Sequence, residues 1–336
     1  MTSLESFYRG KRVLVTGHTS FSGGWLTAFL RLLGANVIGF ALPPATRPNL
    51  FDAAMLDRNI LSIFGDLRNR DAVTSLFAQQ QPEIVIHKAT QFGPERSFSQ
   101  PVETCAMNIM GAVHVLEECR YTRSLRAVVI VTDEVGPVAN SEHPSGRSLY
   151  DSVVSSTELL IGALRKEFFS QPGTALIASA QTADCLAGGD WTEGRLVPEI
   201  VQAMANEHTP VEEPNSAQPW QHVLEPLRGF LLLAQNLYED GPRDLAAGKF
   251  LPRSQPISRR DLAARITSLW YGKAREIEAD HKNRPGVDAI GWKPLLSFDQ
   301  ALQWTVNWYR AYYENPAMAW PMMEAQIGEY MKLPGW

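Results

Sequence analysis

The chain has 336 residues, of which 45% are hydrophobic and 20% are charged, and its formal net charge is −5 at pH 7. This length and composition predict a large core, with one large domain and a smaller lobe. The slightly acidic balance and the lack of a basic run argue against a nucleic-acid partner or an anionic membrane surface. The N-terminus has no apolar signal core, and no stretch approaches the roughly 20 apolar residues of a spanning helix. We therefore expect a soluble, cytoplasmic protein.

The cysteines also indicate a cytoplasmic protein. Cys105, Cys119 and Cys185 are odd in number, lie far apart and lack the spacing of metal ligands. They predict buried free thiols in a reducing compartment and no metal site.

Residues 11–25, KRVLVTGHTSFSGGW, are the first distinctive stretch. An apolar run at 13–15 predicts a strand, and 25–33 predicts a helix after a glycine turn. Gly17, Ser20 and Gly23 stand three apart, the spacing of a loop that aims backbone N–H groups at a dinucleotide pyrophosphate. A serine in the middle position narrows the gap to the phosphate, although its hydroxyl could donate to the same oxygen. An ordinary strand-to-helix turn is the alternative interpretation.

Alternating strands and helices follow this loop. The apolar runs predict strands at 36–42, 60–67, 83–87 and 127–131, and helical spacing predicts helices at 73–79 and 102–119. No acidic residue for a ribose ends the second strand, and Arg47 in the next loop could instead meet a 2′-phosphate. The choice between NAD and NADP therefore stays open.

This alternation predicts an α/β fold with a doubly wound, parallel, Rossmann-type sheet. Ligands bind at the carboxyl ends of such strands, where Gly17, residues 88–91 and residues 132–134 would meet. From residue 188 the chain becomes rich in Trp, Pro and Gly. We predict a dinucleotide-binding domain over 1–187 and a smaller C-terminal α/β substrate lobe over 188–336, with some segments returning to the first domain. The apolar stripe at 298–313 is interpreted as core.

Several motifs together carry a resemblance to a known family. They are TGHTSFSGGW, GDLRN, NIMGAVHVLE, VTDE, a tyrosine at 150, GGDW, PWQHVLEPL and GWKP. In this combination the chain resembles the extended short-chain dehydrogenases/reductases, and among them the CDP-glucose 4,6-dehydratases. The resemblance covers nearly the whole chain, and PWQHVLEPL with GGDW is more specific than the glycine loop.

The resemblance implies a reaction and its catalytic residues. Enzymes of this type hold NAD, oxidise C4 of a nucleotide-linked hexose, eliminate water across C5 and C6, and return the hydride to C6. By position, Tyr150 matches the tyrosine that deprotonates the C4 hydroxyl, and Thr132 matches the hydroxyl partner. Asp133 matches the acid and Glu134 the base. In a shifted register Glu134 is the acid and Val135 takes the basic position. The alternative interpretation is that Asp133 and Glu134 are capping or loop carboxylates without a catalytic role.

The resemblance also implies binding residues. The positions that match cofactor contacts are Gly17, Thr19, Ser20, Phe21, Gly23, Asp66, Leu67, Lys88 and Ala89. The positions that match contacts to a nucleotide-diphosphate hexose, with a CDP-sugar favoured, are Gln91, Asp184, Trp191, Arg195, Gln218 and His222. A homodimer is implied as well, through the helices near 102–119 and 150–168.

The sequence departs from the family at the residue that activates the tyrosine. Four residues after Tyr150, where the family has lysine, this chain has Val154. A free tyrosine has a pKa near 10, so only about one molecule in a thousand is ionised at pH 7. A nearby ammonium can lower that pKa, and an isopropyl group cannot.

Other departures affect the substrate end. Gln181 and Gln218 stand where the family has arginine, and Asp184 replaces an asparagine. These changes predict weaker binding of a diphosphate, because two cations are lost and a carboxylate is gained. Lys88 stands where relatives have an apolar residue, and its ammonium could replace the missing lysine or meet the diphosphate. A solvated lysine at a strand end is the alternative.

Three interpretations follow. The chain is a working 4,6-dehydratase with an altered acid–base arrangement, or it has lost turnover and acts as a binding or scaffolding partner, for example of an active paralogue. As a third possibility, it is an enzyme that acts on another substrate.

Overall fold

A parallel β-sheet forms the centre of the molecule in the computed structural model, which describes residues 2–90, 94–133, 148–206, 217–239, 247–252, 254–272 and 290–336. All pairings between neighbouring strands of this seven-stranded sheet are parallel. In spatial order the strands are β10 (Ala247–Phe250), β6 (Leu176–Thr182), β5 (Ala127–Asp133), β4 (Ile84–His87), β1 (Arg12–Thr16), β2 (Asn36–Ala41) and β3 (Leu61–Phe64). The strand order reverses between β1 and β4, and this order confirms the expected doubly wound α/β fold.

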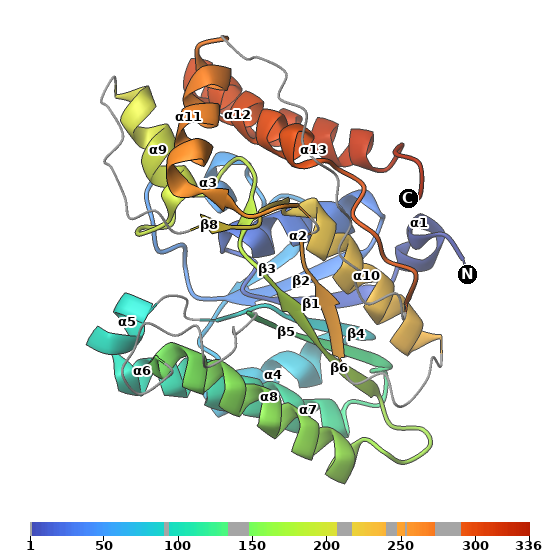
Figure 1. The fold of residues 1–336 in the computed structure, drawn as a ribbon. Helices are drawn as coiled ribbons and strands as arrows, with labels where there is room; N and C mark the ends of the chain where they lie inside the picture. Colours follow the sequence, from blue (N-terminus) through green and yellow to red (C-terminus); the bar gives the residue numbers. More distant parts are fainter. Residues whose placement is uncertain are drawn as a thin grey trace.

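Helices cover both faces of the sheet (Figure 1). Alternate side chains of each strand point to opposite faces, and they enter two separate apolar clusters. One face packs against α4 (Arg70–Gln80), α7 (Gly111–Tyr121) and α8 (Leu149–Phe168). The other packs against α2 (Phe21–Leu32) and α10 (Leu224–Tyr238). Helices α1 (Leu4–Tyr8), α13 (Ala319–Tyr330) and α12 (Phe298–Glu314) lie farther out in the same apolar cluster, where α1 contacts α10 and α13 contacts both α2 and α12.

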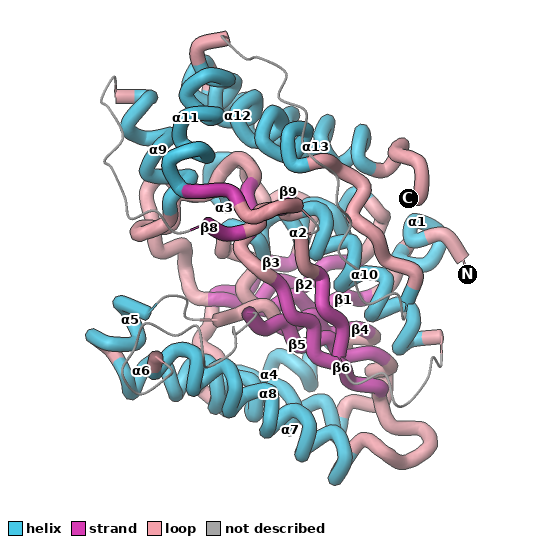
Figure 2. The backbone as a smooth tube through the Cα atoms, viewed as in Figure 1, coloured by secondary structure: helices cyan, strands magenta, loops and turns pink. Residues whose placement is uncertain are grey.

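The remaining elements are short or lie at the rim of the fold (Figure 2). The helices are α3 (Leu50–Ala53), α5 (Pro94–Ser99), α6 (Pro101–Cys105), the π-helix η1 (Ala106–Met110), α9 (Leu196–Ala205), α11 (Arg259–Trp270) and the 3₁₀ helix η4 (Pro316–Met318). Two small sheets pair β7 (Cys185–Leu186) with β9 (Gln221–His222), and β8 (Ala217–Gln218) with β11 (Ile257–Ser258).

The observed elements differ from the predicted ones mainly at their ends. The helix expected at 25–33 begins at Phe21, because the Ser20 side chain caps it. The helix expected over 102–119 is α6, η1 and α7 in succession. Strand β5 extends through Asp133, so Thr132 and Asp133 belong to the strand and not to the loop after it.

Both sides of residue 188 contribute to the central sheet. Strand β10 pairs with β6, and α10 packs against β5 and β6. Helices α9 and α11 lie apart from the sheet, at the upper left of Figure 1, and the two small sheets are separate from it. The boundary at 187/188 stays a prediction about domain organisation.

Three further features bear on the expectations from sequence. No helix in the described part of the chain is both long and apolar enough to cross a membrane. The three cysteines are free thiols, and only Cys119 is fully buried. Within the described residues, no group of three or more potential metal ligands comes together.

Candidate active site

The glycine loop joins β1 to α2 at the carboxyl edge of the sheet. Gly17 has φ +79°, and a Cβ on it would lie 2.9 Å from the Ala89 backbone. A Cβ on Gly23 would lie 2.0 Å from the Gly17 carbonyl oxygen. Only glycine allows this close approach of β1, α2 and the segment after β4. The loop therefore places the N-terminus of the 12-residue helix α2 at the carboxyl edge of the sheet, and this arrangement fits a pyrophosphate.

Ser20 fits this loop for a reason that the sequence does not reveal. Its hydroxyl donates to the Gly17 carbonyl at 2.8 Å and accepts from the Gly23 N–H at 3.2 Å. The hydroxyl thus caps the N-terminus of α2, and its proton is used within the loop. This differs from the expectation that the hydroxyl could donate to a phosphate oxygen. Phe21 is buried at the start of α2, and Thr19 donates to the Leu42 carbonyl beyond β2.

The edge of the sheet near β3 carries an ion pair. Asp66 accepts three hydrogen bonds from the Arg68 side chain, and these bonds hold the pKa of Asp66 below its usual value. Leu67 is buried, and its carbonyl lies 2.8 Å from His114 Nδ1. Arg47 faces a different region: it lines a groove of about 420 Å³ together with Trp191, Gln202 and Tyr312.

A buried hydrogen-bond network organises the end of β4. The Thr16 hydroxyl oxygen accepts from the backbone N–H groups of Lys88 and Ala89, at 3.1 and 3.2 Å. Its proton is therefore left for His87 Nδ1, which lies 2.9 Å away. Burial and the Lys88 charge lower the pKa of His87 to about 4, so this histidine is neutral at pH 7. His87 thus has the structural role of a satisfied core histidine.

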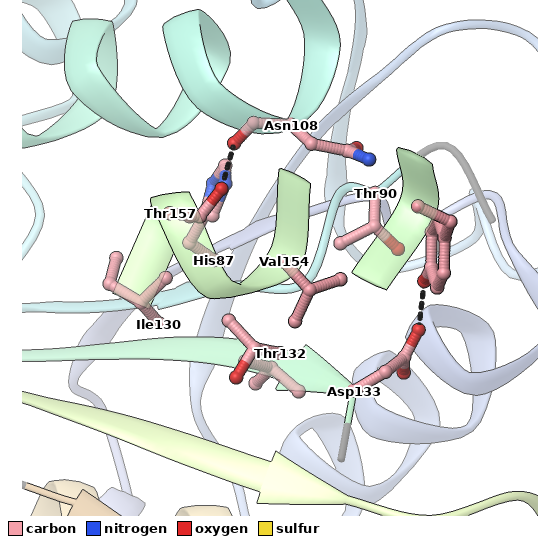
Figure 3. A pocket seen from close by; sticks show the side chains of 10 residues that line it. His87, Thr90, Asn108, Ile130, Thr132, Asp133, Val154 and Thr157 are labelled. Carbon is pink, nitrogen blue, oxygen red and sulfur yellow. Dashed lines mark hydrogen bonds between the residues drawn. The ribbon is translucent and has the colours of Figure 1, made fainter. Parts of the chain in front are cut away.

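Tyr150, Val154, Thr132 and Asp133 meet around a cavity of about 20 Å³, which is room for one water molecule (Figure 3). The Tyr150 hydroxyl donates a hydrogen bond to the Asp133 carboxylate. The Thr132 hydroxyl donates a hydrogen bond to Glu158, on the same helix as Tyr150. Val154 points from α8 toward the strand segment that bears Thr132 and Asp133. The protons of both hydroxyl groups are therefore directed at carboxylates of the chain itself.

The electrostatic surroundings of Tyr150 oppose its ionisation. Burial raises the pKa of Tyr150 far above its usual value, and the Asp133 carboxylate raises it further. Arg195 is the cation whose charge acts in the opposite direction, and burial and Asp133 outweigh it. The ammonium of Lys88 interacts with the Asp133 carboxylate, and burial lowers the pKa of Lys88. A role of Lys88 in place of the missing lysine stays a prediction.

Arg195 is the centre of a second polar cluster beside Tyr150. Its two terminal nitrogens lie 3.3 Å from Asp184 and 3.2 Å from Asp190. Gln218 donates to the other oxygen of Asp184 at 3.2 Å. Burial alone would lower the pKa of Arg195, but the two carboxylates outweigh burial and raise it. The structure thus brings three expected substrate-binding residues together.

Two other expected substrate residues have mainly aromatic surroundings. Trp191 is 5% exposed and packs against Tyr312, with ring centroids 5.0 Å apart. His222 is fully buried between Trp25 and Trp304, and burial lowers its pKa to about 3. His222 therefore lies inside the protein, away from any cleft wall. Gln91 and Glu134, and the Val135 of the shifted register, lie outside the described residues.

The sequence of residues 13–248 matches the NAD dependent epimerase/dehydratase family. The chain belongs to this family. The CDP-glucose 4,6-dehydratase of Salmonella typhimurium is 33% identical to it over 354 residues, which cover 97% of this chain and 98% of that protein. This similarity confirms the resemblance to the extended dehydrogenases/reductases of the nucleotide-sugar 4,6-dehydratase type.

Solved structures of the epimerase/dehydratase family share the fold. A UDP-glucose 4-epimerase of Thermotoga maritima with UDP-glucose has a TM-score of 0.71 at 19% identity, covering 89% of this chain and 99% of that one. A double mutant of a dTDP-glucose 4,6-dehydratase from Streptomyces venezuelae, with NAD bound, also has a TM-score of 0.71 at 19% identity. The latter alignment covers 93% of this chain and 99% of that one.

Sequence reasoning missed Glu158 and Asp190 in this epimerase/dehydratase-family chain. Glu158 lies eight residues after Tyr150, which is two helical turns, so helical periodicity places it on the face of Tyr150 and Val154. Asp190 is part of the GGDW motif, and its backbone exchanges hydrogen bonds with the Tyr309 hydroxyl. The helical spacing could have revealed Glu158. Nothing local could have revealed the partners of Asp190, which are far away in sequence.

Proposed function

We propose that this protein binds NAD but has lost 4,6-dehydratase turnover, and that it acts as a binding or scaffolding partner. The observation that carries the proposal is the hydrogen bond from Tyr150 to Asp133, with Val154 in the place of a cation. A tyrosine that donates to a carboxylate in a buried site keeps its proton at neutral pH. It therefore cannot accept the proton of a sugar hydroxyl.

The cofactor part of the proposal rests on the glycine loop. Gly17 and Gly23 make the close approach described above, and the N-terminus of α2 suits the negative charge of a pyrophosphate. Ala89 and Lys88, at the end of the neighbouring strand, would border the nicotinamide half. When bound, NAD supplies the hydride acceptor of this family's chemistry. Arg47 is the residue that could meet the 2′-phosphate of NADP, but it lines a groove beside Trp191 and Tyr312 instead. NAD is therefore favoured over NADP.

A working CDP-glucose 4,6-dehydratase is the second candidate. The similarity along 97% of the chain to a CDP-glucose 4,6-dehydratase favours it, and so does the Arg195 charge acting on Tyr150. In that case CDP-glucose is the substrate and Tyr150, Thr132 and Asp133 carry the acid–base steps, together with Glu134. The three free thiols support a cytoplasmic location for either candidate.

Turnover distinguishes the two candidates. We expect purified protein to bind NAD and to give no 4-keto-6-deoxy product from CDP-glucose, dTDP-glucose or UDP-glucose, as measured by the alkali-induced absorbance of such sugars. The variant Val154→Lys, assayed in parallel, tests whether the missing lysine alone silences the site. Product formation by the wild-type chain would contradict the proposal. A chain that fails to bind NAD would contradict its cofactor part.

A further inference from the structure

Carboxylates of the protein itself are the partners of the donor groups of Arg195 and Gln218. The guanidinium of Arg195 offers one terminal nitrogen to Asp190 and the other to Asp184. The side-chain amide of Gln218 donates to the second oxygen of Asp184. Asp184 thus presents two oxygens to two convergent donors, which is the contact pattern that a phosphate group makes with such donors.

The two carboxylates on Arg195 have different roles. The Asp190 side chain is 5% exposed, and its other oxygen accepts the Thr192 backbone N–H at 3.0 Å. Asp190 therefore holds the loop and one edge of Arg195. The Asp184 side chain is 39% exposed and covers the other edge of Arg195 from the solvent side. Loss of the Asp184 charge would thus weaken the contact at that edge and leave the Asp190 pair in place.

The charges around this position disfavour an added anion. Among the described residues whose charges act on one another here, Lys88 and Arg195 are cationic. Asp133, Asp184 and Asp190 oppose them. The carboxylates outnumber the cations, so a diphosphate would enter a cluster that is already negative. Removal of the Asp184 charge alone would balance the cluster.

We propose that Asp184 is a specificity-determining residue, a built-in anion that excludes diphosphate-bearing ligands from Arg195 and Gln218. The site beside Tyr150 then accepts ligands that carry no phosphate at this point. This inference rests on the proposed function in one respect, since it concerns the same site. It is read out by ligand binding, whereas the proposed function is read out by NAD binding and turnover.

Isothermal titration calorimetry with CDP as the probe tests this role, on the full chain with and without NAD. The variant Asp184→Asn keeps the shape of the side chain and removes its charge. We expect Asp184→Asn to bind CDP about 10- to 100-fold more tightly than wild type, because a charge-assisted contact to Arg195 becomes available. In the double variant with Arg195→Gln, that gain should disappear.

Asp299→Asn is the matched control, because Asp299 also pairs with an arginine, Arg265, at 2.9 Å but lies on α12. It should bind CDP as wild type does. Thermal unfolding checks that each variant is folded, and Asp184→Ser serves if the asparagine variant is not. The proposal is overturned if wild type and the folded Asp184 variant bind CDP equally, or if the gain survives Arg195→Gln. A failure to bind NAD with the CDP gain intact counts against the proposed function only.

Discussion

Val154 lies one helical turn after Tyr150 on α8, and both side chains line the same small cavity. Because residues four apart share a helix face, a lysine at 154 would bring its ammonium toward Tyr150 and Asp133. The isopropyl group instead leaves Asp133 as the hydrogen-bond partner of the Tyr150 hydroxyl. We therefore expect the residue at position 154 to influence the protonation state of Tyr150, together with burial and the Asp133 charge.

Val154→Lys should therefore lower the pKa of Tyr150, by roughly one to three units for an opposite charge within hydrogen-bonding range. The measurement is the ultraviolet phenolate signal of each protein minus that of its Tyr150→Phe counterpart, at the highest pH at which all remain folded. Val154→Met, which is neutral, is the control. Equal Tyr150 signals in the lysine and methionine variants would contradict the expected electrostatic role of this position.

The residue-level prediction from sequence succeeded where the relation is local. Helical spacing is enough to place Val154 beside Tyr150, and the glycine pattern is enough to place Gly17 at the sheet edge. The orientation of the Ser20 hydroxyl was not predictable, because a cap and a phosphate ligand need the same residue type. The hydrogen bond from Gln218 to Asp184 was also not predictable, because the two residues are 34 positions apart in the sequence.

At the scale of elements, Glu225 on α10 joins three distant parts of the C-terminal half. Its carboxylate accepts the backbone N–H groups of Leu295 and Leu296 and the hydroxyl of Tyr330 on α13. Burial raises the pKa of Glu225 to about 7, although these donors and Arg228 act against the rise. This buried contact explains the glutamate within PWQHVLEPL as a structural anchor.

The raised pKa of Glu225 makes stability depend on pH. Its folded-state pKa of about 7 exceeds the usual 4.5, so the contribution is complete below pH 4.5 and is lost as pH rises through 7. The loss amounts to about 3 kcal/mol for the full shift. Glu225→Gln should not show it. Chemical unfolding at pH 5 and pH 8 measures the difference, with the exposed Glu329→Gln as control, and a pH-independent gap between wild type and Glu225→Gln would refute this role.

The order of the elements was predictable because the strands of a parallel sheet are apolar on both faces. The runs at 13–15, 83–87 and 127–131 needed no tertiary information to be recognised as strands. The π-helix η1 was not predictable, because its Asn108 lies in the packing between α7 and α8 and makes a contact to Thr157. Local sequence carries the periodicity of a helix, and a change in that periodicity reflects tertiary packing.

At the scale of the whole molecule, one helical layer leaves large apolar side chains in solvent. Phe98 on α5 is 89% exposed, Val102 on α6 is 73% exposed, and Leu159 on α8 is 76% exposed. Helices α5 and α6 both contact α8, and the three helices lie together in the layer at the bottom of Figure 1. Exposed apolar faces of this kind mark protein interfaces. We propose that a second copy of this chain covers it, as the expected homodimer requires.

Leu159→Asp should then convert the dimer into a monomer, because a two-fold interface places each substituted residue in the contact twice and buries two new charges. Sedimentation velocity measures the change in mass. Tyr271→Asp is the control, since Tyr271 is 57% exposed but follows α11, in another part of the molecule, and its variant should stay dimeric.

Circular dichroism checks that both variants are folded. A wild-type chain that sediments as a monomer, or a folded Leu159→Asp that sediments as a dimer, would show that this face is not the dimer interface. If α8 lies in the interface, dimerisation also buries the helix that carries Tyr150 and Val154, and the small cavity would then be more rigid in the dimer than in the separated chain.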